Sequence, residues 1–443
     1  MIGAHGVSSF SHRNYRLFFT GQAISLVGTW MQQVAQAWLV LELTSDPFWL
    51  GVVAAAQFIP VLIFGLFAGV LADTLPKRPT LIAVQVVMML LAITLAVLTA
   101  TGVVTVLMIV VLALLLGCAN AVDMPVRQAF AVEMVGREDI GNAVALNSAM
   151  FNGARVVGPA VAGLTIGLVG VAAAIAINAF SFLAVIVALV AMRAADLRPA
   201  PRIARPTSVR GVFDHLGEGL AYVRATPVVL LAVVVVGLVA TFGMNFGVIV
   251  PALAQDQLHS DATGYGFLMA ASGIGSLAAA LWLAFGGKAR VSRIAAGAVV
   301  LGVSEVFLGL SLSYILSIGM MVAVGFGAIL MAATANTMIQ LTVPDVLRGR
   351  VMSVYTTIFA GSTPIGGPLI GGLASWLGIA VATIIGGGLS LLVGLAALAW
   401  TRRLGPRRTE HERRVQPAEP ERRREDAPVL AGPRHSQESR QQS

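Results

Sequence analysis

Twelve long apolar runs constrain the fold of this chain more than any other feature of its sequence. A helix needs about 20 largely apolar residues to cross the hydrocarbon core of a bilayer, and each run has that length. The runs cover residues 17–41, 48–72, 79–100, 104–124, 142–168, 171–191, 227–253, 264–285, 293–313, 315–338, 350–376 and 379–401. Only 11% of the 443 residues are charged, against about 25% in soluble proteins. We therefore expect an all-α membrane protein with twelve transmembrane helices.

Lysines and arginines between the runs indicate the orientation, because cytoplasmic loops retain these residues. If the N-terminus is cytoplasmic, every basic residue between the runs falls on the cytoplasmic side. The charged residues of the outer loops are acids, namely Glu42, Asp46, Asp256 and Asp261. We expect both termini in the cytoplasm, and the net charge of +8 follows from this topology rather than from nucleic-acid binding.

Several functional classes lack their signatures in this sequence. All six histidines lie in polar segments, so the helices offer no histidine ligand for an intramembrane haem or zinc centre. The sequence has no phosphate-binding loop motif, no pair of acids at catalytic spacing and no loop long enough for a soluble catalytic domain. We expect no cofactor, no metal site and no enzymatic activity.

Two segments repeat each other 209 residues apart. Residues 152–164 read NGARVVGPAVAGL and residues 361–373 read GSTPIGGPLIGGL, which aligns Gly158 and Pro159 with Gly367 and Pro368. Small residues let helices approach closely in lipid, and a Gly-Pro pair lets a helix bend. We interpret the four residues as conformational elements, with simple close packing as the alternative.

The repeat and the polar interruptions divide the chain. The longest polar interruption before the tail, 192–226, separates a six-helix half over 1–191 from another over 227–402. Two such halves in parallel orientation are typical of secondary transporters with a site at their interface. Residues 403–443, with ten arginines, seven acids and five prolines, are predicted to be a disordered tail; contact with anionic lipid headgroups is the alternative.

Local motifs add a family resemblance. Residues 69–81, GVLADTLPKRPTL, resemble the loop after the second helix in the major facilitator superfamily, although Thr74 and Pro76 depart from it. Residues 154–163, ARVVGPAVAG, resemble the fifth-helix motif of its proton-coupled antiporters. Residues 11–19, 123–128 and 343–353 are similar to the branch of multidrug pumps and siderophore exporters, such as the enterobactin exporter.

This resemblance implies the major facilitator fold and a transport function. We expect export of an amphipathic small molecule, such as a drug, siderophore or other secondary metabolite, by proton antiport with alternating access. An uptake symporter or facilitator of the same fold is the alternative. The expected partners are the small-molecule substrate, protons and the lipid bilayer, with no nucleic acid, and the expected form is a monomer in the bacterial inner (plasma) membrane.

An aspartate at the cytoplasmic membrane boundary is stabilised by a nearby cation and by a helix N-terminus. We hypothesise that Asp73 latches the two halves in the outward-facing state by contacting Arg348 or Arg350 at the start of the run 350–376. Lys77 and Arg78 border this aspartate in the sequence. The alternative is that all three simply anchor a tight loop.

Asp123 and Arg127 lie four residues apart and share one helical face. A local ion pair is one interpretation, and a switchable gate beside Asp73 is the other. Asp73, Asp123, Glu305 and Glu42 are the acids within or bordering the runs, so they are the candidates for carrying the proton.

Ionisable residues deep in the runs indicate function by default. Arg155 lies 13 residues into its run, roughly 20 Å at 1.5 Å per residue, and we predict that it binds an anionic group of the substrate; a structural pair is the alternative. Glu305 lies equally deep and could carry a proton or serve as a hydrogen-bonded packing residue. Glu42 ends its run at the outer face.

Neutral polar residues in the runs indicate a substrate cavity. Amides and aromatics in an apolar pocket suit a bulky, moderately polar ligand better than a small ion; interhelical hydrogen bonding is the alternative for each. The candidates besides Arg155 are Gln32, Gln36, Gln57, Asn152, Phe242 and Asn245.

Overall fold

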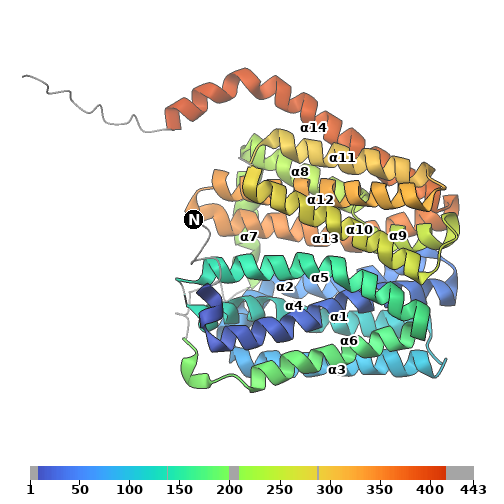
Figure 1. Ribbon diagram of the computed structural model, residues 1–443. Helices are drawn as coiled ribbons and strands as arrows, with labels where there is room; N and C mark the ends of the chain where they lie inside the picture. Colours follow the sequence, from blue (N-terminus) through green and yellow to red (C-terminus); the bar gives the residue numbers. More distant parts are fainter. Residues whose placement is uncertain (1–7, 137, 199–208, 287–288, 416–443) are drawn as a thin grey trace, which may run out of the picture. The chain divides into compact units, whose positions relative to one another are not determined.

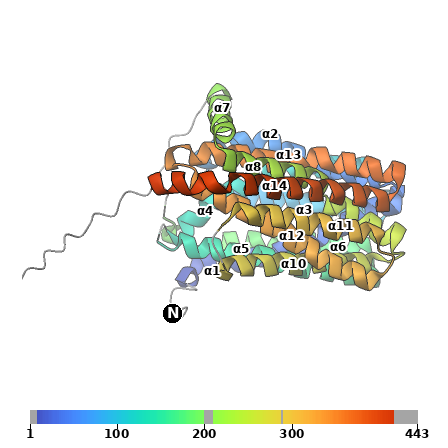
Figure 2. The same cartoon turned by 90° about the horizontal axis from the view of Figure 1, so that it is seen from above.

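The computed structural model describes residues 8–136, 138–198, 209–286 and 289–415, excepting the side chains of 65–74, 209–210, 212–213 and 402–415. All regular structure in these ranges is helical, which confirms the all-α class for them. The long helices up to residue 399 lie side by side along a common direction, and α7 crosses them (Figure 1, Figure 2).

In chain order the segments are η1 (Ser8–Ser11), α1 (Arg13–Thr44), α2 (Pro47–Thr74), α3 (Lys77–Ala100), α4 (Val106–Val135), α5 (Ile140–Val169), α6 (Val171–Val190), η2 (Ala194–Asp196), α7 (Val209–Ala225), α8 (Pro227–Phe242), α9 (Phe246–Ala252), the π-helix η3 (Leu253–Gln257), α10 (Ala262–Gly286), α11 (Val291–Leu310), α12 (Tyr314–Thr342), α13 (Asp345–Leu377) and α14 (Ile379–Val415).

Ten helical spans are long and apolar enough to cross a membrane, judged over the described residues. The expected runs 17–41 and 350–376 form α1 and α13, of 32 and 33 residues, but neither is among the ten. The cause is polarity, because α1 contains four glutamines and the uncharged part of α13 is rich in glycine, serine, threonine and proline. The protein is thus a multi-pass membrane protein, and the number twelve stays a prediction.

Helix packing divides the chain into two groups. Helices α1–α4 and α6 pack mainly within the group α1–α6, and helices α8–α12 pack mainly within the group α8–α13, whereas α5 and α13 pack most closely on helices of the other group. The main contacts between the groups are made by two helix pairs, α2 with α13 and α5 with α10. Because few other elements join the groups, these two pairs determine how the groups fit together.

The expected run 227–253 is not one helix. α8 ends at Phe242 and α9 begins at Phe246, and residues 243–245 between them form the α8–α9 break. The Asn245 Nδ2 donates a hydrogen bond of 2.7 Å to the carbonyl oxygen of Thr241, where a continuous helix would place a backbone N–H. The side-chain amide therefore satisfies a carbonyl that the break leaves open.

The polar segment 192–226 contains a helix of its own, α7. Gly219 of α7 lies so close to α13 that a Cβ there would be 2.6 Å from the carbonyl oxygen of Arg350. The neighbouring Glu218 forms an ion pair with the Arg350 guanidinium. The start of α13 is therefore held by the segment that connects the two helix groups.

The last helix extends beyond its expected end. α14 runs to Val415, so residues 403–415, expected as part of a disordered tail, are helical. Glu410 and Arg414 in this stretch are four residues apart, a spacing that favours helix when the acid comes first. Residues 400–443 form a unit separate from the rest, and residues 416–443 of the predicted tail lie outside the described part of the chain.

Candidate functional site

The bundle has η1 at one end, and the turns after α1, α5 and α13 at the other, the far end (Figure 1). At the far end α2 and α13 meet along glycines, and this contact is the α2–α13 seam. A Cβ at Gly51 would lie 2.3 Å from the carbonyl oxygen of Gly367, and one at Gly371 would lie 2.7 Å from that of Pro47. The Ser375 hydroxyl donates a hydrogen bond to the Asp46 carboxylate. Only backbones without side chains could approach so closely, so this seam is closed.

A second closed contact, the α5–α10 seam, joins the groups at the same end. A Cβ at Gly266 would lie 2.5 Å from the carbonyl oxygen of Pro159. Thr263 Oγ1 donates a hydrogen bond of 3.2 Å to the carbonyl oxygen of Gly163. Gly158 faces α1, where its Cβ would lie 2.4 Å from the Cβ of Trp30. The two Gly-Pro pairs of the sequence repeat therefore belong to helices that make the seams, with Gly367 and Pro159 in direct contact across them.

Arg155 lies on α5 one turn before Gly158. Its guanidinium carbon is 5.8 Å from the centroid of the Trp30 ring, and Trp30 in turn packs edge-on against Phe151. The backbone carbonyl group of Arg155 faces α10, and a Cβ at Gly273 of α10 would lie 2.8 Å from the Arg155 carbonyl oxygen. No acid pairs with Arg155 among the described residues. An intramembrane cation without a counter-charge is costly, and a cation–π contact of about 0.5–2 kcal/mol offsets only part of that cost.

Two of the predicted cavity amides, Gln32 and Asn152, form hydrogen bonds within the bundle. Gln32 is 7% exposed and accepts a hydrogen bond of 2.5 Å from Asn178 of α6, the interhelical arrangement given above as the alternative. Asn152 donates to the carbonyl oxygen of Ser148 in its own helix. Asn178 lies 146 residues from Gln32 in the chain, so the sequence alone gave no signal for this pair.

The other cavity candidates lie on several helices. Gln36 is 8% exposed and Asn245 is 5% exposed. Phe242 and Asn245 flank the α8–α9 break, and the carbonyl oxygen of Gln57 faces α4, where a Cβ at Gly117 would lie 2.3 Å from it. Trp38 of α1 stacks on Tyr265 of α10 with ring centroids 6.1 Å apart. This aromatic contact between the two helix groups was not predicted.

The gating candidates at the η1 end have partners of their own. Asp123 is 1% exposed, forms an ion pair with Arg127 and accepts a hydrogen bond of 2.9 Å from Gln85 of α3. The structure therefore contains the local ion pair, one of the two interpretations of this motif. Lys77 pairs with Glu133 of α4 at 2.7 Å. These contacts tie α3 to α4.

The remaining basic gating candidates contact backbone or acids other than Asp73. Arg78 donates to the carbonyl oxygen of Leu189 at 2.8 Å. Arg348 pairs with Asp345 at 2.5 Å, and Arg350 pairs with Glu218 of α7. The side chain of Asp73, at the end of α2, lies outside the described residues. Its latch with Arg348 or Arg350 remains a proposal.

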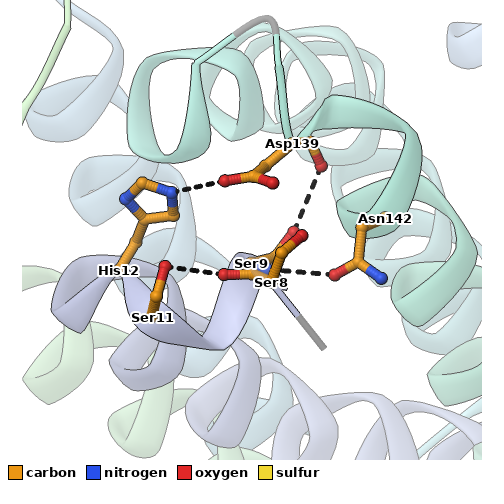
Figure 3. Close-up of polar contacts among 6 residues, drawn as sticks. All are labelled: Ser8, Ser9, Ser11, His12, Asp139 and Asn142. Atoms are coloured by element: carbon orange, nitrogen blue, oxygen red, sulfur yellow. Dashed lines mark hydrogen bonds and ion pairs between the residues drawn. The ribbon is translucent and has the colours of Figure 1, made fainter. Parts of the chain in front are cut away.

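The N-terminal segment is fastened to the start of α5 by a polar cluster (Figure 3). His12 Nε2 lies 2.9 Å from Asp139 Oδ2, Ser9 Oγ donates to the Asp139 carbonyl oxygen at 3.1 Å, and the Ser9 N–H donates to Asn142 Oδ1 at 3.0 Å. Hydrogen bonds from the side chains of Ser8 and then His12 lower the pKa of Asp139, because they favour its charged form.

The remaining two acids differ in their surroundings. Glu42 accepts a hydrogen bond of 2.8 Å from Trp38 Nε1, one turn earlier on α1. Glu305 of α11 is 1% exposed, and neither of its carboxyl oxygens has a hydrogen-bond partner among the described residues. Of the four proton-coupling candidates, Glu305 is the one that the described side chains leave buried and unpaired.

A pocket of about 620 Å³ opens at the far end between the two helix groups. It is lined on one side by residues of the turn after α1, including Asp46, and on the other by Asp256, His259 and Ser375. Asp46 and Ser375 are also the hydrogen-bonded pair of the α2–α13 seam. The pocket therefore lies beside this seam, away from Arg155.

Comparisons with known proteins identify the family. The sequence matches the family model described as transmembrane secretion effector over residues 4–422. It is 29% identical to the multidrug efflux pump Tap of Mycolicibacterium fortuitum over 356 residues, 78% of this chain and 85% of that protein. It is 27% identical to the enterobactin exporter EntS of Escherichia coli O1:K1 / APEC over 271 residues, 60% of this chain and 62% of that protein.

A solved structure shares the fold. The POT family transporter PepTSo aligns with a TM-score of 0.70 at 14% sequence identity, covering 88% of this chain and 98% of that chain. The family model spans nearly the whole sequence, including both helix groups and their seams. The protein therefore belongs to the transmembrane secretion effector family of the major facilitator superfamily, and it is a multi-pass membrane transporter.

Proposed function

We propose that this protein is a twelve-helix secondary transporter that exports an amphipathic small molecule by proton antiport. In this proposal α1–α6 form one six-helix half and α8–α14 form a parallel second half, with α8 and α9 counted as one interrupted helix. Both termini are cytoplasmic, and the protein works as a monomer in the bacterial inner membrane. The relatives named as an efflux pump and an exporter support the outward direction. The two packing groups support the division into halves.

Arg155 carries the proposal for substrate recognition. The cation has no counter-charge among the described residues, lies near Trp30 and belongs to a helix at the interface between the halves. An anionic group on the substrate would supply the missing charge through charge-assisted hydrogen bonds. Trp30 and Phe151 would contact the apolar part. The substrate class is then an amphipathic anion, with Gln36 as a further polar contact.

The closed seams support an assignment of the conformational state. With the η1 end in the cytoplasm, both glycine seams lie in the outer half of the membrane, so this structure corresponds to the inward-facing state. Outward opening must separate Gly51 from Gly367 and Pro159 from Gly266. In the outward-facing state Arg350 would leave Glu218 and pair with Asp73, and this new pair is the proposed latch.

Transport of matched probes tests the substrate class. Cells that express the protein are loaded with a fluorescent amphipathic carboxylate or its methyl ester, and efflux is followed with and without a protonophore. We expect faster efflux of the carboxylate, abolished by the protonophore and by Arg155→Ala, and partly kept by Arg155→Lys.

Other outcomes contradict the proposal in distinct ways. Greater accumulation of the carboxylate in expressing cells would mean uptake, by a symporter or facilitator. Equal efflux of acid and ester, unchanged in Arg155→Ala, would remove the anion from the substrate class. Glu138→Gln, at an exposed residue between α4 and α5, is the control for expression.

A further inference from the structure

Glu305 is a buried acid without a described partner. It lies in the middle of α11 and is 1% exposed, and both carboxyl oxygens lack hydrogen-bond partners. An ionised carboxylate in such a place has lost its water without gaining a donor, which is among the most costly arrangements in a protein interior. The neutral acid has a much smaller cost. The site is therefore suited to a carboxyl group that has taken up a proton.

Among the described residues, the helices packed beside Glu305 bring no charged side chain to it. The π-helix η3 contacts the end of α11, where Gln257 donates a hydrogen bond of 2.9 Å to the carbonyl oxygen of Gly309; its acid, Asp256, is exposed and lines the far-end pocket. α8, α9, α12 and the described side chains of α14 contain no Asp, Glu, Lys, Arg or His, and their one other titratable group is Tyr314 at the start of α12. The nearest charge on α11 itself is Arg293, twelve residues away, or roughly 18 Å along a helix. Within the described residues, only a bound cation could neutralise an ionised Glu305, and the smallest is a proton.

The carboxyl group lies beside the α8–α9 break. A Cβ at Gly243 would lie 3.0 Å from Glu305 Oε2 and 2.5 Å from Ser390 Oγ of α14. The carbonyl groups of Gly243 and Met244 accept no backbone hydrogen bond among the described contacts. A protonated carboxyl group is a donor that open carbonyls can accept from, and unwound helix segments are where transporters place their coupling ions.

We propose that Glu305 is the proton-binding site that couples the proton gradient to transport, and that the α8–α9 break controls its access to water. The inference rests on the proposed proton antiport and names the group that carries the proton. One proton from water forms the O–H bond of Glu305, and the same bond breaks to water on the cytoplasmic side. The bend at Gly243 changes between these two steps.

Two of the other three candidate acids have described partners, and the side chain of Asp73 lies outside the described residues. Asp123 is paired with Arg127 and Gln85, and Glu42 accepts from Trp38. A proton arriving at either would weaken an existing contact, whereas Glu305 loses nothing by taking one. This difference in partners, rather than depth alone, selects Glu305.

Infrared spectroscopy tests proton binding without any substrate. The full-length protein is purified in lipid, and the C=O stretch of protonated carboxyl groups is followed as pH is raised. We expect a band that exchanges slowly in D₂O, is absent in Glu305→Gln and remains in Glu138→Gln. Glu305→Asp, expected to move the band, replaces Glu305→Gln if the latter cannot be purified. A spectrum unchanged by either substitution would overturn the proposal.

Two further measurements test the identity of the bound cation and the coupling role separately. If addition of Na⁺ at constant pH removes the band, the ligand is a monovalent metal ion and the proton proposal is wrong. In proteoliposomes loaded with the carboxylate probe, Glu305→Gln should keep probe exchange at equal pH and lose accumulation driven by a pH gradient. Gradient-driven accumulation by that variant would contradict the coupling role.

The proposed function can fail independently. If the wild type shows the Glu305 band but moves no probe outward, export is wrong while the proton site stands. Gly243→Ala provides a second variant, because its Cβ would press on the carboxyl group. We expect it to shift the band and slow gradient-driven transport, with little effect on exchange at equal pH. A Gly243→Ala protein with an unshifted band would argue against the role of the break.

Discussion

Asp123, Arg155 and Glu305 bring charge into helices that cross the membrane, and their partners differ. Asp123 forms an ion pair with Arg127 and accepts a hydrogen bond from Gln85. Arg155 lies over the ring of Trp30, and Glu305 has no described hydrogen-bond partner. The sequence predicted that Arg155 and Glu305 are deep, because each lies well inside an apolar run, whereas Asp123 lies at the end of its run. It could not predict their partners, because Gln85 and Trp30 come from other helices. The two incompletely neutralised residues are the ones we assign to substrate and proton.

Asp139 gives a pH prediction for the N-terminal cluster. Its pKa is lowered from 3.8 by hydrogen bonds from Ser8 and His12, so the carboxylate stabilises the fold above that value and the contribution is lost as pH falls through the lower, folded-state pKa. Asp139→Asn should lower the melting temperature slightly at pH 5, where the carboxylate of the wild type is ionised. The difference from wild type should shrink near pH 3 in thermal unfolding of the purified protein. A difference that grows in acid would contradict this assignment.

At the scale of elements, hydrophobic periodicity predicted helices and missed their interruptions. The α8–α9 break lies inside an apolar run, and the side chains that leave no room for a Cβ at Gly243, among them Ser390 and Glu305, come from residues far away in the chain. α7 was missed because its segment is polar, although Leu216, Leu220 and Val223 recur at helical spacing. The Gly-Pro repeat predicted conformational elements in α5 and α13, which stays a prediction, and the structure adds the helices on which they pack, α10 and α2.

Gly371 and Gly372, two adjacent glycines of α13, provide a test substitution and a matched control for the α2–α13 seam. A Cβ at Gly371 would lie 2.7 Å from a backbone oxygen of α2, whereas one at Gly372 would be 3.7 Å from the Phe48 ring. Gly371→Ala should destabilise the closed seam by about 1–3 kcal/mol, and Gly372→Ala should be neutral. The measurement is labelling of Ala54→Cys by a membrane-impermeant maleimide, in a Cys118→Ser background. Ala54 lies in α2 at the seam, where a Cβ at Gly367 would be 3.7 Å from its own Cβ. Equal labelling rates in the two variants would show that the seam does not control access.

At the scale of the whole molecule, the closed far end and the proposed proton site at Glu305 belong to helices that pack on one another. The seams, Arg155 and the α8–α9 break lie on helices that contact one another, since α5 packs on α10 and α9 contacts both α1 and α2. A change in the bend at Gly243 therefore reaches the seams through direct packing. At the η1 end, Arg350 at the start of α13 forms an ion pair with Glu218 of α7 and so connects these two helices.

In the proposed latch Arg350 pairs with Glu218 in one state and with Asp73 in the other. Removing the charge of one acid or of the other should therefore shift the ratio of the two states in opposite directions. Glu218→Gln should weaken the inward-facing state and raise labelling of Ala54→Cys, while Asp73→Asn should weaken the outward-facing state, lower labelling and reduce transport with expression intact. A partly exposed ion pair contributes about 0.2–1 kcal/mol, up to roughly a fivefold change in the ratio of states. Changes of the same sign in both variants, or normal transport by Asp73→Asn, would contradict the latch.

Proton movement in inverted membrane vesicles tests the central claim most directly. The vesicle lumen is acidified by respiration, its pH is followed with a fluorescent dye, and the amphipathic carboxylate is added to the medium. Proton-coupled export predicts that the lumen becomes more alkaline in wild-type vesicles, and that it does not with Arg155→Ala or Glu305→Gln. Further acidification of the lumen on addition of the carboxylate would mean that proton and substrate move in the same direction, and would contradict the account.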